Sequence, residues 1–150
     1  MEQHFKRLIS EFCDLTGLEE PDAIAEGQSF NVDEVECAII HQSHTTPENI
    51  YCYIDYGLPP RDQLPAIYDQ LLKSNYLQFC STKATFSLSP HTGHVILVVV
   101  LDLAETTANS LIEQFSYQAQ QALAWRENFS LFDADSNQTL TLGRDPISYS

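Results

Sequence analysis

The chain has 150 residues, a length typical of one domain, with or without a tail. Twenty-one acidic residues stand against seven Lys and Arg, which gives a net charge of −14 at pH 7. Residues 1–60 hold twelve of the acids and only two of the bases. Because such a surface repels phosphate groups and anionic lipid, we expect neither nucleic acid nor a membrane as partner. The same charge is equally compatible with acidic residues that only keep the protein in solution.

Neither the N-terminus nor the cysteines indicate export. The first ten residues, MEQHFKRLIS, have no long apolar run and no small-residue cleavage site, so they predict no secretory signal. The longest apolar stretch, Val95–Leu101, is too short to span a bilayer. The four cysteines are far apart and form no C-x-x-C pair. We therefore expect a cytoplasmic protein whose cysteines are reduced and buried.

The first fifty-six residues predict one helix followed by strands. Apolar residues at steps of three and four predict an amphipathic helix that ends near Gly17, and residues 19–27 predict an acidic connection. A change to a period of two then predicts one or two strands that break near residues 33–34. After a loop at residues 41–49, Ile50–Tyr56 predicts a further strand, which completes an antiparallel meander.

The middle of the chain predicts a second helix. Gly57 and the two prolines after Leu58 end the preceding strand and open a helix, because proline is tolerated only in the first turn of a helix. Pro65 must also lie in that first turn, so the helix does not begin much before Arg61. Its apolar stripe comprises Leu64, Ile67, Tyr68, Leu71, Leu72 and Tyr76.

Two strands and a last helix follow. Ala84–Ser89 alternates, residues 90–93 form a turn, and the apolar run His94–Leu101 predicts a central strand buried on both faces. Thr106–Asn128 predicts a helix. Residues 130–150 have little periodicity and predict a flexible tail after a domain at 1–129. The order α-βββ-α-ββ-α predicts an α+β fold with a mostly antiparallel sheet.

Candidate metal sites fail on their ligand patterns. The pairs His41/His44 and His91/His94 lie in predicted loops or turns, without a cysteine or an acid at ligand spacing. Residues 133–137 resemble the start of a calcium loop, but the sixth position lacks glycine and the twelfth is an arginine that would oppose the cation. We expect no metal and no other cofactor.

No catalytic signature stands out either. The sequence has no phosphate-binding loop, dinucleotide fingerprint or nucleophile elbow. Cys37 and Cys52 lie within apolar patterns, where burial makes a thiol inert. We therefore expect a binding protein and not an enzyme. A small hydrolase with a reactive cysteine is the enzymatic alternative.

Three stretches, taken in order, carry a resemblance to a known family. Residues 26–33 form an acidic-Gly turn before paired strands, residues 57–75 contain a G-x-P … L-L-x-x-N helix, and residues 86–95 precede a long helix that ends in Ala124-Trp125-Arg126. In this order they resemble the Tir chaperone (CesT-like) family, the class I chaperones of type III secretion. The resemblance covers residues 3–129. Residues 78–83 depart from it, since they lack the glycine often found there.

The resemblance implies a homodimer that binds the non-globular N-terminal segment of an effector without ATP and keeps it competent for export. It adds the secretion ATPase as a further partner. The implied dimer interface uses the second helix and the strand after it, although the same residues would equally suit an intramolecular core. This set is Leu64, Ile67, Tyr68, Leu71, Leu72, Phe86 and Leu88.

The resemblance also implies grooves for apolar cargo side chains, built from the first helix and the sheet. A cargo strand that adds to the sheet edge would supply main-chain hydrogen bonds. The expected cargo-binding residues are Phe5, Leu8, Phe12, Val32, Val35 and Ile39. The alternative is a regulatory or adaptor domain similar to the YbjN-like proteins, which would bind a partner but no exported cargo.

Overall fold

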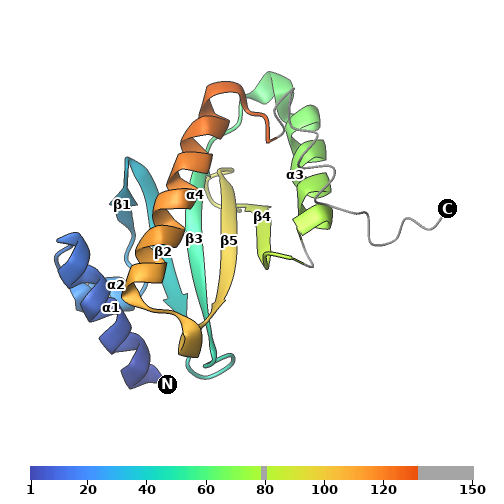
Figure 1. Cartoon of the computed structure of the whole chain (residues 1–150). Coiled ribbons are helices and arrows are strands. Elements are labelled where there is room, and N and C mark those ends of the chain that lie inside the picture. The colour runs from blue at the N-terminus through green and yellow to red at the C-terminus, as the bar shows by residue number, and fades with distance from the viewer. Residues whose placement is uncertain (79–80, 132–150) are drawn as a thin grey trace.

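The computed structural model describes residues 1–78 and 81–131 (Figure 1). Five strands form one sheet in the order β1-β2-β3-β5-β4, and every neighbouring pair is antiparallel. The predicted α+β class and antiparallel sheet are therefore confirmed. The strands are β1 Phe30–Val32, β2 Val35–His41, β3 Asn49–Gly57, β4 Ala84–Leu88 and β5 Val95–Asp102.

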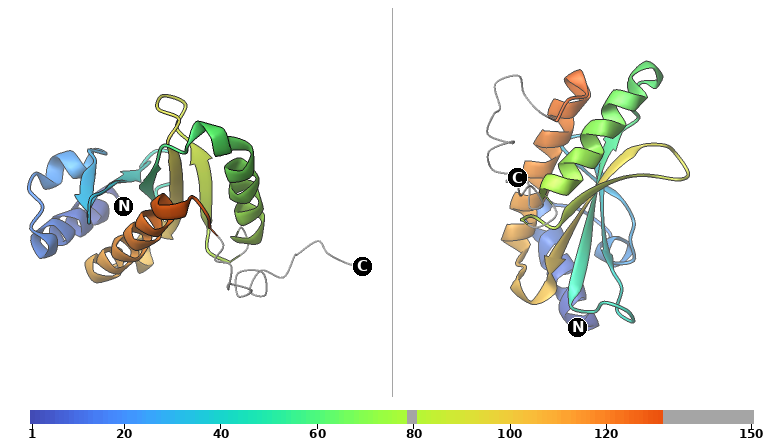
Figure 2. Two further views of the ribbon diagram at one scale, coloured as in Figure 1. Left: turned by 90° about the horizontal axis from the view of Figure 1, so that it is seen from above. Right: turned by 90° about the vertical axis from the view of Figure 1, so that its right-hand side faces the viewer.

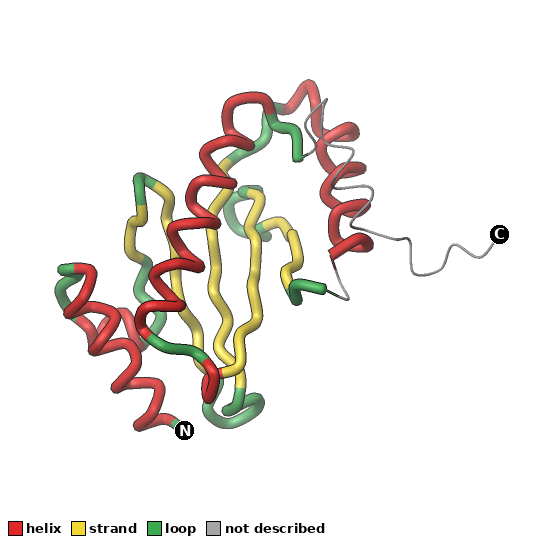
Figure 3. The backbone as a smooth tube through the Cα atoms, viewed as in Figure 1, coloured by secondary structure: helices red, strands yellow, loops and turns green. Residues whose placement is uncertain are grey.

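Three long helices alternate with the strands as predicted, and Figure 3 shows their positions along the backbone. They are α1 Glu2–Thr16, α3 Leu64–Gln78 and α4 Ala108–Asn128. The segment expected to be an irregular acidic connection contains a fourth helix, α2 Pro21–Ala25. The expectation was wrong there because five residues are too few to show a helical period, although Pro21 occupies a position that favours the start of a helix. Single 3-10 turns lie at Arg61–Gln63 and Leu103–Glu105.

The break predicted near residues 33–34 is a tight hairpin turn between β1 and β2. Asp33 and Glu34 have φ angles of 50° and 70°, and Val32 faces Val35 in the register. Two central residues with positive φ are typical of a type I′ turn, whose twist matches that of paired strands. Gln120 Nε2 of α4 donates a hydrogen bond to Asp33 Oδ2 at 3.3 Å, which ties the turn to the last helix.

The hydrophobic core lies between one face of the sheet and two helices. Figure 2 shows α1 and α4 on the same side of the sheet. Three phenylalanines, from α1, β1 and α4, meet there with ring centroids 5.2 to 5.9 Å apart. The meeting rings are Phe12, Phe30 and Phe115. Aromatic contacts across three elements fix how the N-terminal helix docks on the rest of the fold.

The central strand β5 differs from its prediction. Val95, Leu97 and Val99 are buried against the helices, whereas Ile96, Val98 and Val100 on the other face are only half-buried. An uninterrupted apolar run was expected to be covered on both faces. The expectation was wrong for this strand because α1 and α4 both lie on one side of the sheet (Figure 2).

Helix α3 lies at the β4 end of the sheet, away from α1 (Figure 1). It begins at Leu64, directly after the 3-10 turn, so Pro65 lies in its first turn as predicted. Helix α4 ends at Asn128, and Phe129 follows in the left-handed conformation that commonly terminates a helix. The predicted tail at residues 130–150 lies almost wholly outside the described residues.

Candidate functional site

The outer side of α3 and the neighbouring strand β4 form an apolar surface, which we call the α3–β4 surface. A hollow of about 240 Å³ lies between the helix and the strand. Leu72 and Leu88 at its border are 70% and 41% exposed. The residues that line it are Tyr68, Leu71, Leu72, Asn75, Phe86, Ser87 and Leu88. Exposed leucines around an apolar hollow are typical of a surface that another protein covers.

The seven residues expected at a dimer interface all lie on α3 or β4, but at different depths. Ile67, Leu71 and Phe86 are buried and belong to the core of the monomer. Leu64 and Tyr68 are half-buried, and only Leu72 and Leu88 are exposed. The helical stripe thus has an inner side that stabilises the monomer and an outer side available for contact.

Asn75 joins α3 to the edge of the sheet. Its side-chain Nδ2 donates to the Phe86 carbonyl oxygen at 3.0 Å, and its Oδ1 accepts from the Phe86 N–H at 2.7 Å. The side-chain amide thus makes the two hydrogen bonds that an added strand would make with this residue. Sequence reasoning noticed this asparagine only as part of the L-L-x-x-N pattern.

The six residues expected to bind cargo lie together in the region of α1, β1 and β2, but mostly below the surface. Five of them are buried in the core, and only Val32 in β1 is half-buried. The buried five are Phe5, Leu8, Phe12, Val35 and Ile39. In the monomer a cargo side chain can therefore touch most of these residues only if α1 shifts.

The surface beside the start of α1 is polar. A hollow of about 380 Å³ there is bordered by the acids Glu2, Asp22 and Glu26. Phe5 stacks on His41 with ring centroids 4.7 Å apart, and His41 Nε2 lies 2.8 Å from the Pro47 carbonyl oxygen. These contacts give His41 a structural role and not the role of one histidine in a metal-binding pair.

A second apolar surface lies on the side of the sheet opposite α1 and α4, and we call it the open sheet face. Ala38, Tyr53 and Val98 face one another across β2, β3 and β5 in one row of the register. Ile40, Tyr51 and Val100 form the next row, with Ile96 beyond the first. Tyr53 is 36% exposed, and the other six side chains are half-buried.

Sequence reasoning missed the open sheet face because it took β5 to be covered on both sides. The available signal was the second set of alternating residues on β2 and β3, which carries isoleucine and two tyrosines. A hollow of about 390 Å³ extends from Tyr53 and Ile96 to Leu88, so this face continues into the α3–β4 surface. Glu36 and Asp55 border the hollow, which gives it an acidic rim.

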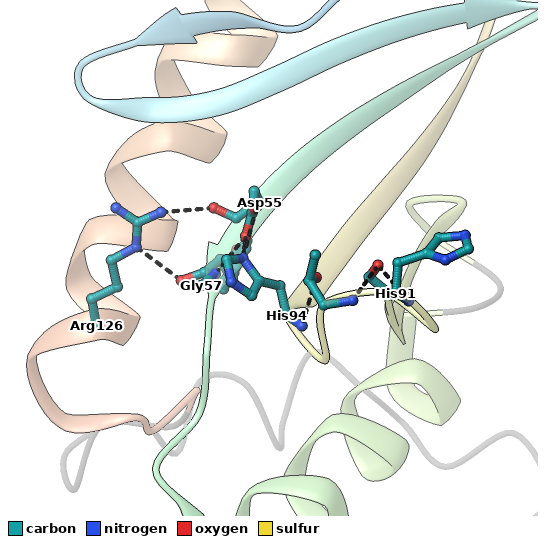
Figure 4. A network of polar contacts seen from close by, with 8 residues as sticks. Asp55, Gly57, His91, His94 and Arg126 are labelled. Atoms are coloured by element: carbon teal, nitrogen blue, oxygen red, sulfur yellow. Dashed lines mark hydrogen bonds and ion pairs between the residues drawn. The ribbon is translucent and has the colours of Figure 1, made fainter.

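A polar network anchors the end of α4 to β3 (Figure 4). Arg126 donates from Nε to the Tyr56 carbonyl and from Nη2 to the Asp55 carbonyl, each at 2.9 Å. The Asp55 carboxylate accepts from the Gly57 N–H at 2.8 Å and lies 3.0 Å from His94 Nδ1. Gly57 has a φ of 107°, and a Cβ there would lie 3.3 Å from Arg126 Nε. Glycine thus allows the bulged strand and the guanidinium to meet.

The described cysteines do not provide a reactive thiolate. Burial raises the pKa of the Cys37 and Cys52 thiols to about 12, and it also raises the pKa of Cys13. Such thiols stay protonated at neutral pH, which argues against the cysteine hydrolase for these three residues. Within residues 1–78 and 81–131 no group of three or more His, Cys, Asp or Glu side chains is placed to hold a metal ion. The calcium-like segment 133–137 lies outside the described residues.

No described helix is long and apolar enough to cross a membrane. Comparison with models of protein families places the chain among known proteins. The family model described as the Tir chaperone protein (CesT) family matches residues 7–126. The chain belongs to this family. The resemblance drawn from the sequence is thereby confirmed, and the match takes in the α3–β4 surface and the open sheet face. Curated protein sequences gave no significant match.

Solved structures share the CesT-family fold with this chain. The ExsC–ExsE complex matches with a TM-score of 0.66 at 20% identity, covering 85% of this chain and 95% of that one. The Yersinia pestis type III secretion chaperone SycH, solved with a fragment of YscM2, matches with a TM-score of 0.54 at 20% identity, covering 80% and 98%. The HopA1–SchA chaperone–effector complex matches with a TM-score of 0.61 at 12% identity, covering 84% and 95%.

Proposed function

We propose that this protein is a type III secretion chaperone that works as a homodimer, binds the non-globular N-terminal segment of an effector and keeps it competent for export without ATP. The observation that carries the proposal is the presence of two connected apolar surfaces on a small domain, the α3–β4 surface and the open sheet face. A dimer needs one such surface, and an unfolded ligand needs another. Membership of a chaperone family supports the same conclusion.

The α3–β4 surface is the proposed dimer interface. Leu72 on α3 and Leu88 on β4 are exposed beside an apolar hollow that Tyr68 also lines. A two-fold axis at this point would bring the same hollow of both copies together, as isologous interfaces require. Burying an exposed leucine side chain contributes about 1.5 to 3 kcal/mol, and symmetry doubles each contribution.

The edge of the sheet at β1 is the proposed site of strand addition by cargo. The strand order leaves two edges, β1 and β4. Asn75 already occupies the Phe86 N–H and carbonyl of β4, so a strand cannot pair there without displacing it. Strand addition supplies main-chain hydrogen bonds irrespective of side chains, which suits a ligand that has no fold of its own.

We propose that the six residues expected to bind cargo have two different roles. Val32 on β1 would touch the cargo directly, and the five buried residues of that set would form the wall that holds β1 and α1 in place. The apolar side chains of the cargo would also lie on the open sheet face, with Tyr53 as its most exposed member. Ordering an extended segment costs free energy, so a large contact area is needed to offset it.

The charge supports a chaperone of this kind. A net charge of −14 per chain keeps molecules with exposed apolar surfaces from aggregating and favours cargo segments with basic residues. In this proposal the protein works in the cytoplasm, and the secretion ATPase is a partner on the grounds of the family resemblance alone. One structural neighbour is a type III secretion chaperone solved with a fragment of YscM2, and another is the HopA1–SchA chaperone–effector complex.

Affinity purification of the tagged protein from its native cells under secretion conditions tests the proposal. We expect one dominant partner, which stays bound through an N-terminal fragment of a few tens of residues. A matched tagged Leu72→Asp variant shows whether the partner requires the dimer. A folded regulator as the bound partner would favour the adaptor alternative and contradict the export role.

A further inference from the structure

A cleft of about 420 Å³ separates α3 from α4 and lies above β4 and β5. It belongs to neither of the two surfaces described above, although Phe86 forms part of both its floor and the α3–β4 hollow. The floor is apolar and consists largely of Tyr56, Phe86, Leu97 and Val99. An apolar floor of this size in a small domain is typical of a site that binds another group.

The α4 wall of the cleft carries glutamines. Gln114, Gln118 and Gln121 lie on one face of the helix at steps of four and three, with Tyr117 beside them. Gln118 is mostly buried and lines the cleft. Each glutamine side chain can both donate and accept hydrogen bonds, which matches the alternating N–H and carbonyl groups of an extended peptide.

The cleft is electrically neutral in an otherwise acidic protein. None of the described residues that line it is an Asp, Glu, Lys or Arg. An apolar floor, amide walls and no formal charge favour a peptide of small polar and apolar residues over a basic or acidic one. This separates the cleft from the acid-rimmed open sheet face, where a basic cargo is the better match.

The described chain ends at the mouth of this cleft. After α4, Phe129 packs edge-on against Trp125 with ring centroids 5.0 Å apart. The backbone N–H of Leu131 then donates to Gln70 Oε1 of α3 at 3.0 Å, and Leu131 itself lines the cleft. The chain therefore crosses from α4 to α3 at the cleft, and its described part ends there.

The nineteen residues that follow contain a stretch of the required chemistry. Residues 136–143, SNQTLTLG, carry no charge, and leucines at 140 and 142 alternate with threonines at 139 and 141. Alternation in an extended chain directs both leucines to the same side. Four residues lie between Leu131 and Ser136, and the five steps from one to the other span up to about 17 Å when extended, which is comparable to the roughly 22 Å length of α3.

We propose that the C-terminal segment of this chain docks in its own cleft between α3 and α4, with residues 136–143 in extended form. The leucines at 140 and 142 lie on the floor formed by Phe86, Leu97 and Val99, and the glutamines of α4 bond the backbone of the segment. The docked segment also borders β4, whose other side belongs to the α3–β4 surface.

Site-specific photo-crosslinking in the full-length chain tests this placement. A benzophenone amino acid at Gln121 lines the cleft, and one at Ser116, an exposed position of the same helix outside the cleft, is the matched control. We expect Gln121 to crosslink to residues 136–143 at least tenfold more than Ser116 does. Equal crosslinking from the two positions, or none from Gln121, would overturn the proposal.

The occupant is distinguished from a second copy by mixing isotope-labelled and unlabelled chains before irradiation. We expect crosslinks within one chain only, and crosslinks of mixed isotopic mass would overturn the assignment to the chain's own segment. A full-length Leu140→Asp, Leu142→Asp variant should lose the crosslink and shift the methyl resonances of Leu97 and Val99. Ser148→Asp, which adds a charge outside the stretch, should leave both unchanged. Unchanged methyl resonances in the leucine variant would contradict docking.

Discussion

The side-chain amide of Asn75 hydrogen-bonds both backbone groups of Phe86, so a helix closes one edge of the sheet in the way an extra strand would. The N–H and carbonyl of an edge strand otherwise present a template for pairing with any extended chain. With β4 closed by α3, β1 at the opposite edge is left for the strand addition that we propose. The same contact holds the α3–β4 surface in shape, because its hollow lies between these two elements.

Replacing Asn75 should loosen α3 from β4. Asn75→Ala removes two hydrogen bonds, each worth about 0.5 to 1.5 kcal/mol, so we expect the free energy of unfolding to fall by about 1 to 3 kcal/mol. Urea denaturation followed by circular dichroism measures this change. Hydrogen exchange at the Phe86 amide should accelerate at the same time. Asn109→Ala, at an exposed position of α4, is the control and should leave both quantities unchanged.

Leu72→Asp should separate the dimer without unfolding the monomer. The side chain is 70% exposed, so an added carboxylate costs little in one copy, whereas two carboxylates facing each other across a two-fold axis repel. Sedimentation velocity should show a shift from dimer to monomer at unchanged helix content. Leu15→Asp on α1, where the leucine is 59% exposed, should remain dimeric. A dimeric Leu72→Asp would remove the α3–β4 surface from the proposed interface.

Tyr53→Glu should weaken cargo binding at least tenfold while the fold and the dimer remain. The tyrosine lies on the open sheet face and is 36% exposed, so the substitution puts a charge where apolar cargo side chains are proposed to lie. Isothermal titration with the N-terminal segment of the identified cargo gives the affinity. Ser116→Glu on the outer side of α4 adds the same charge elsewhere and should bind normally. Unchanged affinity for Tyr53→Glu would exclude this face.

Phe12→Ala should act on stability and not selectively on cargo. Phe12 is 1% exposed and contacts Phe30 and Phe115, and removing such a side chain costs about 3 to 5 kcal/mol. Thermal denaturation should show a large drop in Tm, and cargo affinity per folded molecule should change little. A variant that kept its Tm and lost cargo binding would instead place Phe12 in an open groove.

The protected cysteines predict a pH dependence. Because the pKa of Cys37 rises from 9.0 to about 12 on folding, the folded thiol keeps its proton where the unfolded one loses it. The stabilising contribution is fully present below pH 9 and is lost as the pH rises towards 12, at up to about 1.4 kcal/mol per pH unit. The free energy of unfolding, measured by denaturation at increasing pH, should therefore fall less steeply for Cys37→Ser than for the unaltered chain. Equal slopes would show that the thiol is not held protonated.

The sequence predicted the elements well because their signals are local. The three- and four-residue steps of Leu8 and Phe12, the prolines before α3 and the alternation in Ala84–Leu88 each report on a backbone period. Helix α2 was not predicted because a helix of little more than one turn is too short to show a period. The family could also be predicted from the sequence, since its motifs are short patterns at helix and strand ends.

The candidate site was harder to predict because burial depends on which neighbour covers a face. The apolar side of α1 was expected to line a groove, but α4 and β1 cover it in the monomer, so Phe12 belongs to the core. The apolar run in β5 was expected to be buried on both faces of the strand, but Val98 lies on the open sheet face. A periodic pattern identifies an apolar face and leaves its partner undetermined. Likewise, no local signal pairs Asn75 with Phe86, eleven residues further along the chain.

Native mass spectrometry of the complex purified from native cells, before and after limited proteolysis, tests the proposed chaperone function most directly. We expect two copies of the 17.0 kDa chain together with one partner, which proteolysis reduces to an N-terminal fragment of a few tens of residues that stays bound. A single copy bound to an intact folded domain that survives proteolysis would contradict the chaperone function, and so would a chain that carries no partner under secretion conditions.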